Sequence, residues 1–344
     1  QIFLGVFQKY IQIYKAAIAE VLGRAVQLGL VWYFFQNNSE LLFFLSALIV
    51  GSFVIFITNF IFARRLVRFN LKTSLKEWKR IIKTTYPIAV SLVFTLLYFK
   101  LDTILLSIMK SQEDVGIYNA AYKVLETIIF FPAAFIGLML PRLSEYIKES
   151  KEKFSDLLSS LNDIMTISAL PVVVGGFLVS ESMVYLIGGS EFLLASAPLQ
   201  VLFFAIGIIF YGTLYGNTVI ALGIQKKAMW AYFWGFALNF IANLVFIPKY
   251  SYMGAAWTTL ITEIFVTAYL LWIIKKEVNF VFSIKTTIKA VFATALMGLF
   301  VWFIYGLDEG FSISLLFGTI LGGGVIYTFL VGRSLRKLST LIQE

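Results

Sequence analysis

Apolar runs long enough to cross a lipid bilayer recur along almost the whole chain. A membrane-spanning helix needs about 20 mostly apolar residues, and ten segments of this sequence meet that requirement. Only helices or closed barrels satisfy their backbone in lipid, and the sequence lacks the short alternating segments of a barrel. We therefore predict an all-α polytopic membrane protein. The predicted spans are 12–35, 41–63, 87–109, 116–140, 161–187, 195–222, 227–247, 253–274, 287–306 and 311–332.

The composition also indicates that the solvent of this protein is lipid. Of the 344 residues, 60% are hydrophobic and 14% are charged, whereas a soluble domain has about half and about a quarter. The chain contains no cysteine and no histidine. This excludes disulfides, thiol chemistry, histidine-centred catalysis and ordinary zinc or copper sites. We therefore predict neither a catalytic nor a metal site.

The lysines and arginines alternate between the two sides of the predicted membrane. Connections on one side hold 23 of the 28 cations, and those on the other side hold only Lys110 and Lys249. Because cytoplasmic loops carry the excess of Lys and Arg, we predict a multi-pass protein of the cytoplasmic membrane with both chain ends in the cytoplasm. The net charge of +9 then reflects topology and not nucleic-acid binding.

Two cytoplasmic connections are longer than the others. Residues 64–86 are basic with apolar residues at helical spacing, a pattern typical of a helix on an anionic membrane surface. A calmodulin-type or nucleic-acid target is the alternative interpretation of that segment. Residues 141–160 mix charges of both signs and predict a solvated amphipathic helix. The outer connections are short.

Lys100 and Asp102 lie inside the predicted span 87–109. At the rise of an α-helix, they are about 13 Å and 10 Å from its outer end, which is beyond the reach of either side chain to water. A charge facing lipid there costs about 2.5–3.5 kcal/mol. We therefore predict that both face the bundle interior or a wet cavity, on different faces because they are two residues apart.

Three further sites place ionisable groups deep in predicted spans. Arg24 and Glu20 are one turn apart, Lys123 and Glu126 are three residues apart, and Glu263 stands alone. Static ion pairs between or along helices would explain each pair taken by itself. Together with the two charges above, the set comprises three cations and four anions. Ionisable groups at such depth indicate a functional site.

Two prolines, Pro132 and Pro171, lie inside predicted spans. Each is expected to kink its helix, because proline removes a backbone donor and clashes with the preceding turn. Broken helices near the middle of the membrane are common in transporters.

Two adjacent stretches resemble a known family. Residues 86–107 read YPIAVSLVFTLLYFKLDTILLS, and residues 115–146 read VGIYNAAYKVLETIIFFPAAFIGLMLPRLSEY. They are similar to helices seven and eight of the Wzx-type flippases for lipid-linked oligosaccharides, in the multidrug/oligosaccharidyl-lipid/polysaccharide exporter superfamily. The stretch GNTVIALGIQKK at 216–227 resembles the C-terminal half of that family. The resemblance is clearest over residues 80–275.

The resemblance implies two six-helix bundles around a central cavity, in proteins of twelve to fourteen helices. If Pro87 begins the seventh helix, about four spans are missing before residue 1, and the chain is N-terminally truncated. The implied organisation is the remainder of the N-terminal bundle at 1–63, a basic cytoplasmic linker at 64–86, the C-terminal six-helix bundle at 87–275, and two additional spans with a cytoplasmic tail at 276–344.

The resemblance also implies a function. Such a transporter, which is not an enzyme, would flip undecaprenyl-pyrophosphate-linked oligosaccharide repeat units across the cytoplasmic membrane by alternating access, for O-antigen, capsule or exopolysaccharide biosynthesis. Arg24, Lys100 and Lys123 would contact the phosphate or the sugar. No cofactor is implied besides a coupling ion, which is a proton or Na⁺. The carboxylates that would couple to this ion, or tune the cations, are Glu20, Asp102, Glu126 and Glu263.

The implied partners are the lipid-linked oligosaccharide, membrane lipids, and a polysaccharide polymerase with its chain-length machinery, but no nucleic acid. A multidrug or organic-cation antiporter of the same superfamily is the nearest alternative, because it shares the fold and needs an anionic, aromatic cavity. A membrane-embedded polysaccharide polymerase or ligase is a third interpretation. It is disfavoured because short outer connections leave little room for a catalytic surface.

Overall fold

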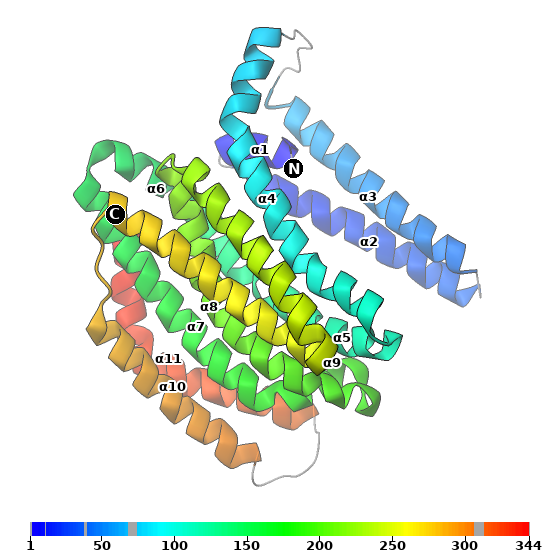
Figure 1. Cartoon of the computed structure of the whole chain (residues 1–344). Coiled ribbons are helices and arrows are strands. Elements are labelled where there is room, and N and C mark those ends of the chain that lie inside the picture. Colours follow the sequence, from blue (N-terminus) through cyan, green and yellow to red (C-terminus); the bar gives the residue numbers. More distant parts are fainter. Residues whose placement is uncertain (1, 11, 38–39, 68–73, 306–312, 344) are drawn as a thin grey trace. The chain divides into compact units, whose positions relative to one another are not determined.

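The computed structural model describes residues 2–10, 12–37, 40–67, 74–305 and 313–343, and the regular elements within these ranges are all helical (Figure 1). The predicted outer connections at 36–40 and 307–310 lie partly or wholly outside the described residues. The helices are α1 (Ile2–Lys9), α2 (Tyr14–Gln36), α3 (Leu41–Arg64), α4 (Leu75–Met109), α5 (Gln112–Ile128), α6 (Phe130–Glu149), α7 (Lys151–Gly188), the 3₁₀ turn η1 (Ser190–Ala195), α8 (Ser196–Ala221), α9 (Gln225–Glu277), α10 (Ile284–Tyr305) and α11 (Ile313–Gln343).

The chain divides into two compact units, Gln1–Ile81 and Ile82–Glu344. In the first unit, α2 and α3 approach closely through glycines. A β-carbon on Gly23 would lie 2.2 Å from Cγ1 of Ile55, so only glycine fits there without a shift. Small residues at such contacts are typical of packed membrane helices.

The described part of the connection 64–86 is not a separate surface helix, as the sequence had suggested. Residues 68–73 lie outside the described residues, and α4 then runs without a break from Leu75 through Pro87 to Met109. Its first part is rich in leucine, lysine, glutamate and arginine, which are good helix formers. The basic segment is therefore the beginning of the same helix that forms the next apolar span.

The predicted amphipathic helix at 141–160 is also wrong. Helix α6 ends at Glu149 and α7 begins at Lys151, with Ser150 between them in an extended conformation. The Ser150 hydroxyl accepts hydrogen bonds from the backbone N–H groups of Glu152 (3.1 Å) and Lys153 (3.5 Å). A serine in this position satisfies donors that the first turn of a helix leaves free, so the two helices meet in a tight turn.

The two internal prolines behave differently. Helix α5 ends at Ile128 and α6 begins at Phe130, two residues before Pro132. Proline cannot donate to the carbonyl four residues earlier, which here belongs to Ile128, so this interruption agrees with the prediction. Helix α7 instead continues through Pro171.

Helix α9 is two spans in one element. Nine stretches of described helix are long and apolar enough to cross a membrane, and α9, with 53 residues, is the longest. The backbone leaves the helical conformation at Ser251 (φ 49°, ψ −131°), and Asn239 before this break donates to Thr262 after it (3.3 Å). The halves of α9 therefore fold back on each other as a hairpin, which accounts for the two predicted spans 227–247 and 253–274.

The core of the second unit lies along α7, α8 and the α9 hairpin, and α10 and α11 pack beside α7 (Figure 1). Helices α7 and α8 touch closely at Gly176. A β-carbon there would lie 2.0 Å from a ring carbon of Phe203, which is 1% exposed. Because the ring is surrounded by the core, it has little space into which it can move.

We expect Gly176→Ala to lower the thermal unfolding midpoint, because the added methyl group overpacks the α7–α8 contact at a cost of about 1–3 kcal/mol. Gly137→Ala is the matched control, since a β-carbon at Gly137 in α6 meets nothing within 4 Å. The control should be as stable as the wild type or more stable, because alanine favours a helix over glycine. Size-exclusion chromatography after heating the detergent-solubilised protein measures both, and equal midpoints would contradict the packing described.

Candidate functional site

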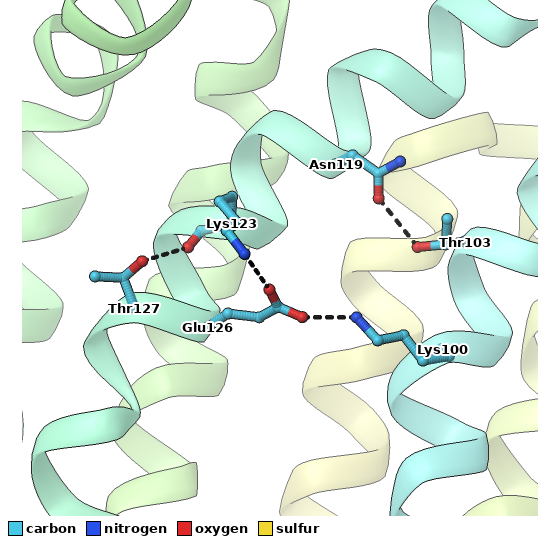
Figure 2. Close-up of polar contacts among 6 residues, drawn as sticks. All are labelled: Lys100, Thr103, Asn119, Lys123, Glu126 and Thr127. Atoms are coloured by element: carbon cyan, nitrogen blue, oxygen red, sulfur yellow. Dashed lines mark hydrogen bonds and ion pairs between the residues drawn. The ribbon is translucent and has the colours of Figure 1, made fainter. Parts of the chain in front are cut away.

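A stripe of polar side chains runs along one exposed face of α4 and α5 (Figure 2). We call it the polar stripe; its members are Lys100 and Thr103 of α4 and Asn119, Lys123, Glu126 and Thr127 of α5. The residues of α5 recur every three or four positions, so they share one face of the helix, whereas the opposite face of α5 is buried in the core. The polar stripe therefore lies on the surface of the second unit, and Lys100 is not in the bundle interior, the first of the two environments predicted for it.

Glu126 joins the two lysines of the polar stripe (Figure 2). Its Oε1 atom lies 2.7 Å from Nζ of Lys100, and its Oε2 atom lies 3.0 Å from Nζ of Lys123. The lysine side chains are 59% and 75% exposed. The pair Lys123–Glu126 agrees with its spacing along the sequence, and the Lys100–Glu126 pair adds a link between α4 and α5. With two ammonium groups and one carboxylate, this cluster keeps a net charge of +1.

Asp102 lies in the bundle interior, 1% exposed, and on a different face of α4 from Lys100. Its carboxylate accepts hydrogen bonds from the Tyr118 hydroxyl (3.0 Å), from Nδ2 of Asn239 (3.1 Å), from Nδ2 of Asn243 (2.6 Å) and from the Thr259 hydroxyl. The four donors come from α5 and from both halves of α9. Asp102 therefore lies in the bundle interior, which is one of the two environments predicted for it.

Glu263 is buried beside a cavity of about 570 Å³ within the second unit. It is 4% exposed, it interacts with Tyr98, and its Oε1 atom has no hydrogen-bond partner among the described residues. Residues of α4, α5, α6, α8 and both halves of α9 line this cavity, and on α9 they extend from Gln225 to Leu270. The described lining includes the carboxylates of Glu126 and Glu263 and no lysine or arginine. We call it the acidic cavity; Glu126 is already paired with Lys100 and Lys123, so Glu263 is its one carboxylate without a cation partner among the described residues.

Arg24 lies in the first unit, on α2. Its Nε atom donates to Glu20 (3.0 Å) and its Nη1 atom donates to Gln27 (2.9 Å), and its side chain is 61% exposed. The pair Glu20–Arg24 thus forms as its four-residue spacing predicts.

Sequence reasoning missed the partners of the buried acids. Asn239 and Asn243 are one turn apart in the apolar stretch LNFIANLVF. Two amides on the same face of an apolar helix indicate a buried polar partner, so this pattern could have revealed them. Tyr118, Thr259 and Tyr98 gave no comparable signal, because tyrosine and threonine are common in apolar helices.

Several known proteins are similar to this chain in sequence. Residues 3–147 match the family described as polysaccharide biosynthesis protein. The chain is 25% identical over 238 residues to the capsular polysaccharide biosynthesis protein CapF of Staphylococcus aureus, covering 68% of this chain and 59% of CapF. It is 24% identical over 189 residues to Agl15 of Haloferax volcanii, a probable low-salt glycan biosynthesis flippase, covering 55% and 40%.

The chain is thus similar to polysaccharide biosynthesis proteins over part of its length. It spans less than two thirds of the length of either curated relative.

Solved structures show the fold of this chain. The lipid II flippase MurJ in its inward closed conformation matches with a TM-score of 0.73 at 16% identity, over 98% of this chain and 71% of MurJ. A MOP superfamily transporter from Pyrococcus furiosus matches with a TM-score of 0.52 at 17% identity, over 76% and 66%. A MATE protein in the straight conformation matches at 0.53 and 16%, over 76% and 67%.

The predicted fold class is thus confirmed: the described residues form an all-helical, multi-pass membrane protein with the fold of MurJ and MATE transporters. The matches include proteins named as flippases and transporters, the class that the sequence predicted.

We expect Asp102→Ala to lower the free energy of unfolding by roughly 3 kcal/mol or more, because four buried donors lose their acceptor. Asp102→Asn should cost less, since its amide oxygen still accepts. The control Asp156→Ala removes an exposed aspartate of α7 and should change stability by less than about 0.5 kcal/mol. Thermal unfolding in detergent measures all three, and an Asp102→Ala protein as stable as the control would refute the network.

Proposed function

We propose that the full protein moves undecaprenyl-pyrophosphate-linked oligosaccharide repeat units across the cytoplasmic membrane. It would do so by ion-coupled alternating access, for the synthesis of O-antigen, capsule or exopolysaccharide. The homology to polysaccharide biosynthesis proteins and the flippase fold support this class of activity.

The observation that carries the proposal is the polar stripe. Lys123 is about 16 Å from the start of α5, measured at the rise of an α-helix. A charged group facing lipid at such depth costs several kcal/mol, so this face of the span needs water or a polar ligand. A diphosphate fits the surplus positive charge, because ammonium groups form strong, charge-assisted hydrogen bonds with phosphate oxygens.

Glu126 gives the polar stripe a defined shape. By bonding both Lys100 and Lys123, it holds two flexible side chains near each other on neighbouring helices. An arriving phosphate would then meet two ammonium groups already close together, which lowers the entropy cost of binding. The sugar would contact the amide and hydroxyl members, Asn119, Thr103 and Thr127. Arg24 of the first unit is a separate candidate cation for the phosphate or the sugar.

The acidic cavity supports coupling to a proton or Na⁺. Glu263 presents an oxygen without a partner beside this cavity, and a buried oxygen in that state is costly unless something binds it. Glu263 lies one helical turn after Thr259, which donates a hydrogen bond to Asp102. A cation that neutralises Glu263 would therefore also change the electrostatic surroundings of Asp102, whose hydrogen bonds join four spans.

The same cavity favours a second candidate, transport of organic cations. Tyr98, Phe99 and Tyr232 line it together with two carboxylates, and aromatic faces and negative charge are the groups that attract such cations. Uptake of a labelled organic cation into proteoliposomes, compared with translocation of a labelled lipid-linked oligosaccharide, distinguishes the two functions.

We expect Lys123→Ala and Arg24→Ala each to reduce surface polysaccharide about tenfold, because each removes one charge-assisted contact to the substrate. The variants replace the native protein in its host, and immunoblots of the membrane fraction establish equal abundance. Lys153→Ala is the matched control, since Lys153 is an exposed lysine in a comparable ion pair with Glu149 (2.7 Å). Wild-type polymer levels in both test variants would refute the role of these cations.

We expect Glu263→Gln to abolish the dependence of transport on a proton or Na⁺ gradient. Glutamine keeps the shape of the side chain but has no negative charge for a proton or Na⁺ to neutralise. Translocation of fluorescent lipid-linked oligosaccharide in proteoliposomes, with and without each gradient, measures this dependence. A Glu263→Gln protein that still responds to the gradient as the wild type does would assign coupling to another group.

A further inference from the structure

A second pocket, separate from the polar stripe and the acidic cavity, lies where the two ends of the α9 hairpin meet. Its volume is about 230 Å³. Three aromatic rings, two ammonium groups and one apolar side chain form its walls. These belong to Lys227 and Trp230 of the first half of α9 and to Tyr269, Trp272, Ile273 and Lys276 of the second half.

The Lys276 ammonium group is positioned by an aromatic ring. Its Nζ atom lies 3.4 Å from the centre of the Trp272 ring, and the Tyr269 ring meets Trp272 edge to face at 5.6 Å. A cation over an indole ring is held in place without losing its charge. In the described part of the chain Lys276 forms no ion pair, whereas Lys227 pairs with Glu277. The pocket therefore retains an uncompensated positive charge.

The surroundings of the pocket are basic. The hairpin begins with Lys226 and Lys227 and ends with Lys275 and Lys276, and Glu277 is the one acidic residue at these ends. A concave site with this charge attracts anions.

The pocket also has the setting of a lipid headgroup site. Tryptophan and tyrosine favour the level of the headgroups in a membrane, and the pocket contains both. Further along the same face of α9, Trp234 and Ile241 are exposed by 51% and 61%. A molecule with an anionic head and an apolar chain would neutralise the charge of the pocket and cover this apolar face.

We propose that this pocket binds the phosphate of an anionic phospholipid, with the acyl chains along the exposed apolar face of α9. Lys276 and Lys227 contact the phosphate, and Trp230 and Trp272 enclose the glycerol region. This site is independent of the transported substrate, because none of its residues belongs to the polar stripe or the acidic cavity.

Native mass spectrometry of the detergent-purified protein, titrated with phosphatidylglycerol or with phosphatidylcholine, tests the site. We expect the wild type to prefer phosphatidylglycerol and Lys276→Ala to lower that affinity about fivefold, the contribution of one lysine at an anionic lipid surface. Binding of zwitterionic phosphatidylcholine should not change. Lys276→Arg should retain the preference, because it retains the charge.

Lys285→Ala is the matched control, since Lys285 is an exposed lysine near the start of α10 and outside the pocket. An equal loss in this control would mean that general surface charge, and not the pocket, binds the lipid. Unchanged phosphatidylglycerol binding by Lys276→Ala, in protein that elutes as the wild type does, would also overturn the proposal. Displacement of phosphatidylglycerol by inorganic phosphate would assign the pocket to free phosphate and overturn the lipid assignment.

Discussion

The buried carboxylate of Asp102 is the interaction on which the arrangement of the second unit depends. A membrane provides no water to satisfy a charge, so the protein itself must supply every donor. Four side chains from α5 and from both halves of α9 converge on this one group of α4. Because a carboxylate offers about four acceptor positions, this number of donors fills it. Any motion that separates these helices must break the set or bring a cation to replace it.

The polar stripe and the acidic cavity share one carboxylate. The polar stripe carries a surplus of positive charge on an exposed face, and the acidic cavity carries two carboxylates inside the same unit. Glu126 belongs to both, since it pairs with the lysines and lines the cavity. Under the proposed function, an anion on the stripe and a cation in the cavity would both act on this carboxylate, which would couple their binding.

The α9 hairpin links the interior of the unit to its surface. Its middle region supplies Asn239, Asn243 and Thr259 to Asp102 and places Glu263 at the cavity, while its lysine-rich ends form the aromatic pocket. Ser251 makes this possible, because its non-helical backbone turns one 53-residue element into two antiparallel spans. A straight helix of that length would be about 80 Å long, far more than the thickness of a bilayer.

The sequence by itself determined the elements and the local pairs. Apolar runs of bilayer length predicted the spans, and the spacings of Glu20–Arg24 and Lys123–Glu126 predicted ion pairs that depend only on the geometry of one helix. The tertiary structure alone decided which charges are buried and which are exposed. Lys100 meets Glu126, 26 residues away, and Asp102 meets Asn243, 141 residues away. Periodicity shows that a residue lies on a polar face but does not show which distant helix packs against that face. Burial and partner are set by the packing of several spans together, and for that reason they could not be derived from the pattern of any one span.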